Sequence, residues 1–277
     1  MFKNVLVGVD GRPNGRDAIV LASHLTDADG KLTLAHIHVG PGSEASASEA
    51  AKALLEQERT ACDVSAELIG IRSDSPGRGL HQYAEAHDAD LLVVGSCSHG
   101  AFGRAMLGDD TRSALNGASC AVAIAPLGYA QHPNAIANVG VGYNGSQESQ
   151  AALAVARQLA APTNAPVHVL EVVSIPTYAY TGLMPPAIGE SIDMMLSEAA
   201  TRMKDLHDVD GRAVYGITGE ELAAFSEELD ILVVGSRSYG PVRRLVLGST
   251  SDYLERNARS ALLVLPRVAA APTGPLA

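Results

Sequence analysis

The sequence predicts an α/β protein made of two tandem Rossmann-like domains, each with a five-stranded, mainly parallel sheet and helices on both faces. Two observations lead to this prediction: the chain repeats itself, and within each repeat short apolar runs alternate with segments of helical period. The 277 residues are enough for two ordinary domains. Hydrophobic residues make up 47% of the chain and charged residues 18%, which is typical of globular proteins.

The repeat is clearest around one apolar motif. Asp90 to Ser96 reads DLLVVGS, and Asp230 to Ser236, 140 residues later, reads DILVVGS. Nearer the front of each half, Asn4 to Asp10 (NVLVGVD) resembles Asn138 to Asn144 (NVGVGYN), 134 residues later. The difference between the two offsets indicates an insertion in the second half, which we place in the Pro-, Gly- and Tyr-rich stretch 174–189.

These offsets divide the chain into a first domain, residues 1–128, and a second domain, residues 136–268. Pro126 to Ala137, with two prolines, is interpreted as the linker, and the last nine residues as a frayed tail. The runs LLVVG and ILVVG are continuously apolar, so we expect central strands covered on both faces. The strands expected in the first half are Asn4–Val9, Leu32–Val39, Ala66–Ile71, Leu91–Gly95 and Ala121–Ala125.

Composition excludes several classes of function. The net charge of −11, the aromatic content of 4% and the lack of Trp argue against a nucleic-acid partner. No apolar stretch approaches the roughly 20 residues of a membrane span, so we expect no membrane partner and a cytoplasmic location. Three cysteines, Cys62, Cys97 and Cys120, without CxxC spacing argue against a disulfide framework and a structural zinc site.

A Gly/Ser-rich loop follows the fourth expected strand of each half, where open parallel sheets bind ligands. From Gly235 to Ser249 the second-half loop carries three arginines, Arg237, Arg243 and Arg244, and no acid. In the first half, from Gly95 to Asp109, Arg104 and Asp109 cancel. A carboxylate at Asp109 would repel a phosphate 4 Å away by about 4 kcal/mol at an effective dielectric of 20. The second half is therefore the better predicted anion site.

The loop spacing, repeated after two matching strands, and the acid that ends the first strand resemble the nucleotide-binding universal stress proteins. The chain looks like a tandem member, and the resemblance covers nearly all of it except the linker and the tail. The resemblance implies the five-stranded Rossmann-like fold, in which many members bind ATP. It also implies that the fifth strands pair the two halves into an intramolecular pseudo-dimer, and that two chains could associate further as a homodimer.

In such members the glycine loop wraps the phosphates, and residues that end the first and second strands hold the adenosine. Carried over to the second half, the expected nucleotide contacts are Asn144, Val172, Gly235, Arg237, Ser238, Gly240, Gly248, Ser249 and Thr250. In the first half they are Asp10, Ile37, Gly95, Ser98 and Gly108. The motif is imperfect, because Ser98 and Ser238 replace a glycine and Asn144 replaces an aspartate. Gly248 permits close backbone approach, and Ser249 would N-cap the next helix or donate its hydroxyl to a phosphate.

We therefore expect a stress-response protein that binds ATP as a regulatory ligand, mainly in its second half, with a Mg²⁺ requirement left open. No catalytic residue is assigned, and enzymatic activity is expected to be slow ATP hydrolysis at most, because the G-x-x-x-x-G-K-[ST] loop is absent. A nucleotide-free interaction module on the same fold is the alternative from another class. No metal site is expected: His36 and His38 share one strand face, but no third ligand is visible.

Overall fold

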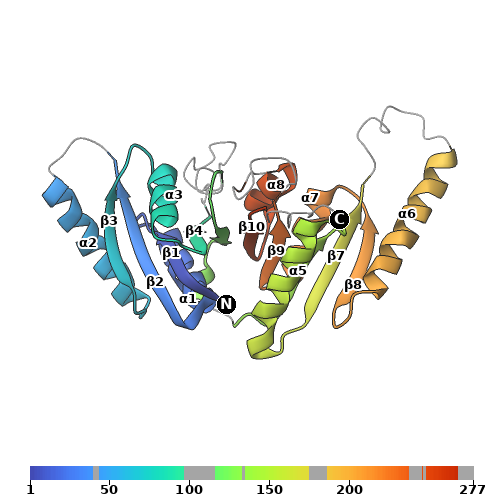
Figure 1. Cartoon of the computed structure of the whole chain (residues 1–277), viewed down its shortest axis with the longest axis horizontal. Coiled ribbons are helices and arrows are strands. Elements are labelled where there is room, and N and C mark those ends of the chain that lie inside the picture. Colours follow the sequence, from blue (N-terminus) through green and yellow to red (C-terminus); the bar gives the residue numbers. More distant parts are fainter. Residues whose placement is uncertain are drawn as a thin grey trace, which may run out of the picture.

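The protein forms one ten-stranded sheet flanked by helices, as seen in a computed structural model (Figure 1). The structure describes residues 1–39, 44–96, 116–132, 135–174, 186–236, 245 and 248–267. The strand order is β3-β2-β1-β4-β5-β10-β9-β6-β7-β8, so each half contributes five neighbouring strands. Within each half every pair is parallel, which confirms the mainly parallel α/β class.

The first half alternates strands and helices in the order that the sequence predicts. Its described elements are β1 (Phe2–Gly8), α1 (Pro13–Leu25), β2 (Thr26–His38), α2 (Glu44–Ala61), β3 (Glu67–Arg72), α3 (Pro76–Ala86), β4 (Leu91–Gly95) and β5 (Ala121–Ala125). The fourth and fifth strands have the predicted bounds. The second strand begins six residues before the predicted Leu32, because Thr26 already pairs with Phe2 across an irregular register.

The second half repeats this order. Its described elements are β6 (Val139–Tyr143), α5 (Gln147–Ala160), β7 (Val167–Val173), α6 (Pro186–Lys204), β8 (Asp210–Tyr215), α7 (Thr218–Phe225), β9 (Ile231–Gly235), α8 (Ser249–Asn257) and β10 (Ala261–Leu265). Helices α2 and α6 lie at the two outer ends of the sheet, while β5 and β10 meet at its centre (Figure 1).

Two buried clusters cover opposite faces of the sheet. One packs α1, α2, α5 and α6 against one face, and its members include Leu25, Leu55, Leu159 and Met203. The other packs α3, α7 and α8 against the opposite face through Leu80, Leu222 and Leu254. Each cluster contains residues from both halves. Helices therefore cover both faces, as continuously apolar strands require.

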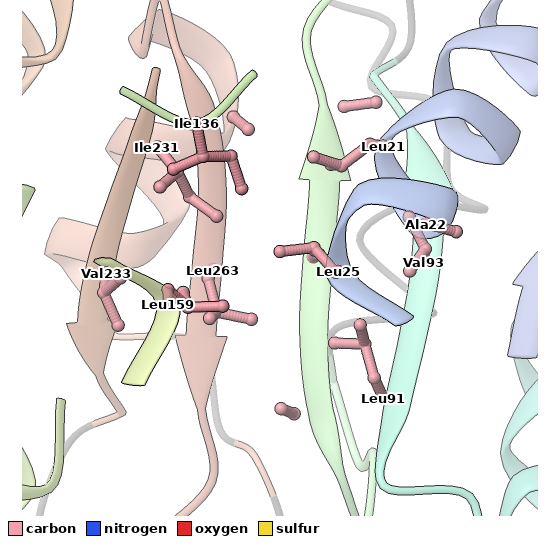
Figure 2. Packing of buried hydrophobic residues seen from close by; sticks show 14 of the residues in the cluster. Leu21, Ala22, Leu25, Leu91, Val93, Ile136, Leu159, Ile231, Val233 and Leu263 are labelled. Atoms are coloured by element: carbon pink, nitrogen blue, oxygen red, sulfur yellow. The ribbon is translucent and has the colours of Figure 1, made fainter. Parts of the chain in front are cut away.

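The halves join through their fifth strands, which pair antiparallel with Leu262 opposite Ile124 and Val264 opposite Val122. This is the arrangement that the family resemblance implies for the two halves. All ten residues of the two strands are buried. Figure 2 shows Leu21, Ala22 and Leu25 of α1 on the first-half side and Ile231, Val233 and Leu263 on the second-half side. The pairing leaves neither fifth strand as an exposed edge.

The linker is docked on the first half instead of running freely over the surface. The Asp17 carboxylate, 3% exposed on α1, accepts hydrogen bonds from the backbone N–H of Gly128 (2.9 Å) and of Ala130 (2.7 Å). The Tyr129 hydroxyl lies 3.0 Å from His24 Nδ1, and burial raises the pKa of Tyr129 to about 12. Across the described residues, no helix has the length and apolar character that crossing a bilayer requires.

Candidate nucleotide site

A cavity of about 400 Å³ opens at the carboxyl ends of β6, β7 and β9. Such volumes are typical of small-molecule sites, and the carboxyl edge of a parallel sheet is where open α/β folds bind ligands. The starts of α5, α7 and α8 complete its wall. Of the nine second-half residues expected to contact a nucleotide, the cavity brings together Asn144, Val172, Gly235, Gly248 and Thr250.

Asn144 shapes the turn that leads from β6 into α5. Its Oδ1 accepts a hydrogen bond from the Ser146 N–H at 3.1 Å, and Gly145 between them has a φ of +76°. In the first half, Asp10 Oδ1 accepts from the Arg12 N–H at 3.0 Å, and Gly11 has a φ of +79°. The turn needs one side-chain oxygen followed by a residue that tolerates positive φ, so an amide replaces the carboxylate without changing the geometry.

Gly235 and Gly95 end β9 and β4 where a helix start crosses very close to the strand. A Cβ on Gly95 would lie 2.1 Å from the backbone oxygen of Asn14, and one on Gly235 would lie 2.7 Å from the Cβ of Glu148. Any side chain at these positions would displace the start of α1 or α5. Close packing therefore accounts for both glycines without a ligand, although Gly235 also lines the cavity.

The helix start beside the cavity differs from one expectation. Gly248 is the N-cap of α8, with extended φ and ψ of −82° and 167°, and Ser249 is the first helical residue. The interpretation of Ser249 as the N-cap is wrong, because the helix begins one residue earlier than that interpretation required. Gly248, Thr250 and Ser251 line the cavity, whereas Ser249 is exposed and outside its lining. Because the first-turn N–H groups of a helix lack partners within the helix, the start of α8 offers hydrogen-bond donors for an anion beside the cavity.

The inner wall of the cavity is apolar. Val172 and Leu170 project from β7 on the same face, and Leu222 of α7 packs beside them. In the first half, Ile37 lies on the matching face of β2, against Gly79 of α3. The predictions for Arg237, Ser238, Gly240, Ser98 and Gly108 lie outside the described residues, as do Arg243, Arg244, Asp109 and Cys97.

A family model described as the universal stress protein family matches residues 1–126 and again residues 136–266. The chain belongs to this family. A universal stress protein of Mycobacterium tuberculosis is 26% identical over 210 residues, which are 69% of each chain. A second one from the same organism is 29% identical over 189 residues, covering 65% of this chain and 62% of that protein. The family membership therefore rests on both halves.

Solved structures show the same fold. A universal stress protein from Archaeoglobus fulgidus superposes with a TM-score of 0.65 at 18% identity, covering 95% of this chain and 98% of that one. A further solved universal stress protein, described as a complex with cAMP, covers 48% of this chain with a TM-score of 0.34. The first likeness extends over both halves and establishes the tandem architecture.

Sequence reasoning missed several residues that line the cavity of this universal stress protein. Ser236 is 3% exposed, and its Oγ has no hydrogen-bond partner in the described part of the chain. Ser174 directly follows β7, and Thr218 begins α7. The signal that would have found Ser236 is its place directly after the central strand, at the carboxyl edge where the ligand crevice lies.

Glu148 is the other missed residue, and it is the one charged side chain of the described cavity lining. Its carboxylate lies 4.0 Å from Arg267 Nε, and its side chain is 12% exposed. The first half has Asn14 at the matching position, 134 residues earlier. The described lining is therefore neutral to acidic, and the cationic character expected for the site depends on arginines outside the described residues.

The histidine pair does not form a metal site in the described residues. His36 Nδ1 hydrogen-bonds to the Val9 backbone oxygen at 2.8 Å, which is a packing role. No group of three or more His, Cys, Asp or Glu side chains in the described part of the chain could hold an ion. Cys120 is buried, and burial raises the pKa of its thiol to about 12, so it is unreactive at neutral pH.

Proposed function

We propose that this universal stress protein is a cytoplasmic stress-response protein that binds ATP as a regulatory ligand in its second half, residues 136–268. The observation that carries the proposal is the cavity at the carboxyl ends of β6, β7 and β9, bordered by the start of α8. It combines an apolar wall, seven Ser or Thr side chains and a helix N-terminus, which suit a base, a sugar and a phosphate group in turn.

The adenine ring would lie against Val172 and Leu170, because an aromatic base gains most from the apolar wall. The phosphates would lie at Gly248 and Thr250, because these residues line the cavity at the start of α8, where the helix dipole favours negative charge. Ser236 would donate a hydrogen bond to the ligand, which gives its buried hydroxyl a partner that it lacks among the described residues. Arg237, Arg243 and Arg244 of the loop would neutralise the remaining charge.

Glu148 favours a second candidate function, slow ATP hydrolysis. A carboxylate that lines the cavity beside Gly235 would act as a general base toward water or as a ligand of a nucleotide-bound Mg²⁺, which takes one or two protein carboxylates together with phosphate oxygens. Release of inorganic phosphate that Glu148→Gln abolishes, while ATP affinity stays within threefold, would establish this activity. Absence of phosphate release from the wild type would mean that the protein binds ATP without hydrolysing it.

The experiment that tests ATP binding is mass spectrometry of the small molecules released when the purified protein is denatured, followed by calorimetric titration with ATP, cAMP and GTP. We expect an adenine nucleotide in the released fraction and tighter binding of ATP than of the other two. Release of no nucleotide together with absence of binding would favour the interaction module. Tighter binding of cAMP than of ATP would identify cAMP, and not ATP, as the ligand. Sedimentation of the same sample tests the predicted homodimer.

A further inference from the structure

The chain that leads into the second-half site is fastened to the first half at Leu245. The Gly117 N–H donates a hydrogen bond to the Leu245 backbone oxygen at 2.9 Å, and the Leu245 N–H donates to the Ala118 oxygen at 2.8 Å. The Leu245 side chain is 0% exposed and belongs to the same buried cluster as Ala118, Cys120 and Val122. Both backbone groups of Leu245 are thus bonded to the other half, and its side chain is buried in a cluster to which both halves contribute.

Leu245 precedes Gly248, the N-cap of α8, by three residues. Gly248, Thr250 and Ser251 line the cavity. Three residues of chain span at most about 10 Å, so fixing Leu245 restricts where α8 begins. Anchoring of this kind lowers the ordering entropy that a flexible binding segment would lose when the ligand binds.

Gly117 makes this anchor geometrically feasible. Its φ is +97°, a conformation that residues with a side chain rarely adopt. Among the described residues, a Cβ at this position would meet only the His81 ring, at 3.6 Å, which is ordinary contact. Replacing Gly117 by alanine would therefore change the local backbone preference without a clash, and Gly117 lies outside the lining of the cavity.

The sequence suggests that this anchor is not reciprocal. The first-half residue 140 positions before Leu245 is Ala105, which has a single methyl group. The residues 140 positions after Gly117 and Ala118 are Asn257 and Ala258, at the end of α8, and their described partners lie within that helix: Asn257 Nδ2 donates to the Tyr253 oxygen, and the Ala258 N–H donates to the Leu254 oxygen. A large apolar anchor is thus present in the second-half loop and missing at the matching first-half position.

We propose that the first half serves as the platform of the second-half nucleotide site, with Leu245 and Gly117 as positioning residues. The proposal rests on the proposed ATP binding and adds a role for a half whose own loop carries Asp109. It also explains why two halves are joined in one chain: the half with the weaker phosphate loop supplies the surface on which the other site is built.

The test compares two alanine substitutions at first-half glycines with positive φ in the full-length protein. Gly117→Ala strains the anchor, whereas Gly128→Ala strains a linker glycine with a φ of +84°, whose N–H donates to Asp17 and whose Cβ would meet no described atom within 4 Å. We expect Gly117→Ala to weaken ATP binding at least about fivefold and Gly128→Ala to leave the dissociation constant within about twofold, at similar Tm. Equal affinities for the two variants would overturn the platform.

A second pair of variants controls for a general loss of stability. Leu245→Ala and Leu232→Ala each remove the same atoms from one buried cluster, but only Leu245 is bonded to the first half. We expect similar falls in Tm and weaker ATP binding for Leu245→Ala alone. Equal loss of affinity would contradict a positioning role. If the wild type binds no ATP, the proposed function fails and the platform fails with it, whereas normal ATP binding by Gly117→Ala removes only the platform.

Discussion

The two halves share their scaffold and differ in what surrounds the crevice. Asp10 and Asn144 close the same turn, and Gly95 and Gly235 accommodate the same close approach of a helix start. These residues belong to the family motif, yet the fold alone requires them. Their presence in both halves therefore says little about which half binds a nucleotide.

The positions that differ between the halves are not required by the turn or by the close approach of the helix start. Glu148 replaces Asn14 beside the strand-end glycine, and Ser249 replaces Asp109 at the start of the last helix. Ser236 has a serine, Ser96, as its first-half counterpart, so the residue type at this position does not discriminate, but its buried hydroxyl has no described partner. A ligand contact is thus better sought among side chains that packing leaves unexplained.

The largest expected effect concerns the shared glycines. We expect Gly95→Ala to lower the free energy of unfolding by at least about 3 kcal/mol and Gly235→Ala by somewhat less, because the new methyl group overpacks against a helix backbone. Urea unfolding without ligand measures both. Stabilities within about 0.5 kcal/mol of the wild type would mean that the glycines serve the ligand and not the packing.

The next largest effect is expected when the negative charge of Asp109 is copied to the matching second-half position, Ser249. Ser249→Asp should weaken ATP binding at least about tenfold, since the new charge would stand between Gly248 and Thr250, the two lining residues at which the phosphates are proposed to lie. The same carboxylate in the first turn of α8 should raise stability by about 0.3–1 kcal/mol. Calorimetry and urea unfolding would show the two effects in opposite directions. Ser249→Asn is the neutral control, and an equal loss of affinity in it would remove the electrostatic explanation.

Ser236→Ala isolates the buried hydroxyl. Loss of one hydrogen bond to the ligand should weaken ATP binding roughly fivefold, while stability of the free protein stays equal or rises because the removed hydroxyl is buried and has no partner in the described part of the chain. Ser96→Ala makes the same change at the matching first-half position. Similar behaviour of the two variants in ATP titrations would show that Ser236 makes no contact with the ligand.

His24 of α1 makes the pH dependence of stability differ between the two halves. Burial lowers the pKa of His24 from its ordinary value of 6.5, so folding favours the neutral ring. Its contribution to stability is complete above about pH 6.5 and is lost as the pH falls below that value. The matching second-half residue, 134 positions later, is Gln158. We expect His24→Gln to reduce the decline in Tm between pH 7.5 and 5.5, and an unchanged decline would contradict a buried neutral ring.

The smallest effect is expected at the first-strand turn. Asn144→Asp and Asp10→Asn exchange the two halves' side chains and keep the oxygen that accepts the turn hydrogen bond. Stability should change by less than about 0.5 kcal/mol in either variant, since the Arg12–Asp10 pair at 3.7 Å is exposed. A larger change in urea unfolding would show that the carboxylate and the amide are not equivalent here.

Local pattern predicts the scaffold well and the cavity only partly. The runs at Leu91–Gly95 and Ala121–Ala125 gave correct strand bounds, because buried parallel strands are continuously apolar. The start of β2 was missed, since TDADG has the composition of a turn although Thr26 pairs with Phe2. The docking of the linker on Asp17 was also missed, because its partners lie more than 100 residues away.

Glu148 and Ser236 show the same limit within the site. Each is unremarkable in its local sequence and meets the cavity only because β6, β9 and the starts of α5 and α8 converge there. Spacing identifies residues of a known motif, whereas side chains that enter a crevice from other elements depend on the tertiary arrangement.

The most direct test of a single nucleotide site in the second half is the stoichiometry of ATP binding by calorimetric titration of the full-length protein. The expected result is one ATP per chain. Ser249→Asp should reduce the affinity, whereas Asp109→Ser should leave it unchanged. The first half of the Asp109→Ser variant still lacks loop arginines that match Arg237 and Arg243. Two equivalent sites, or one site that only first-half substitutions weaken, would contradict the account.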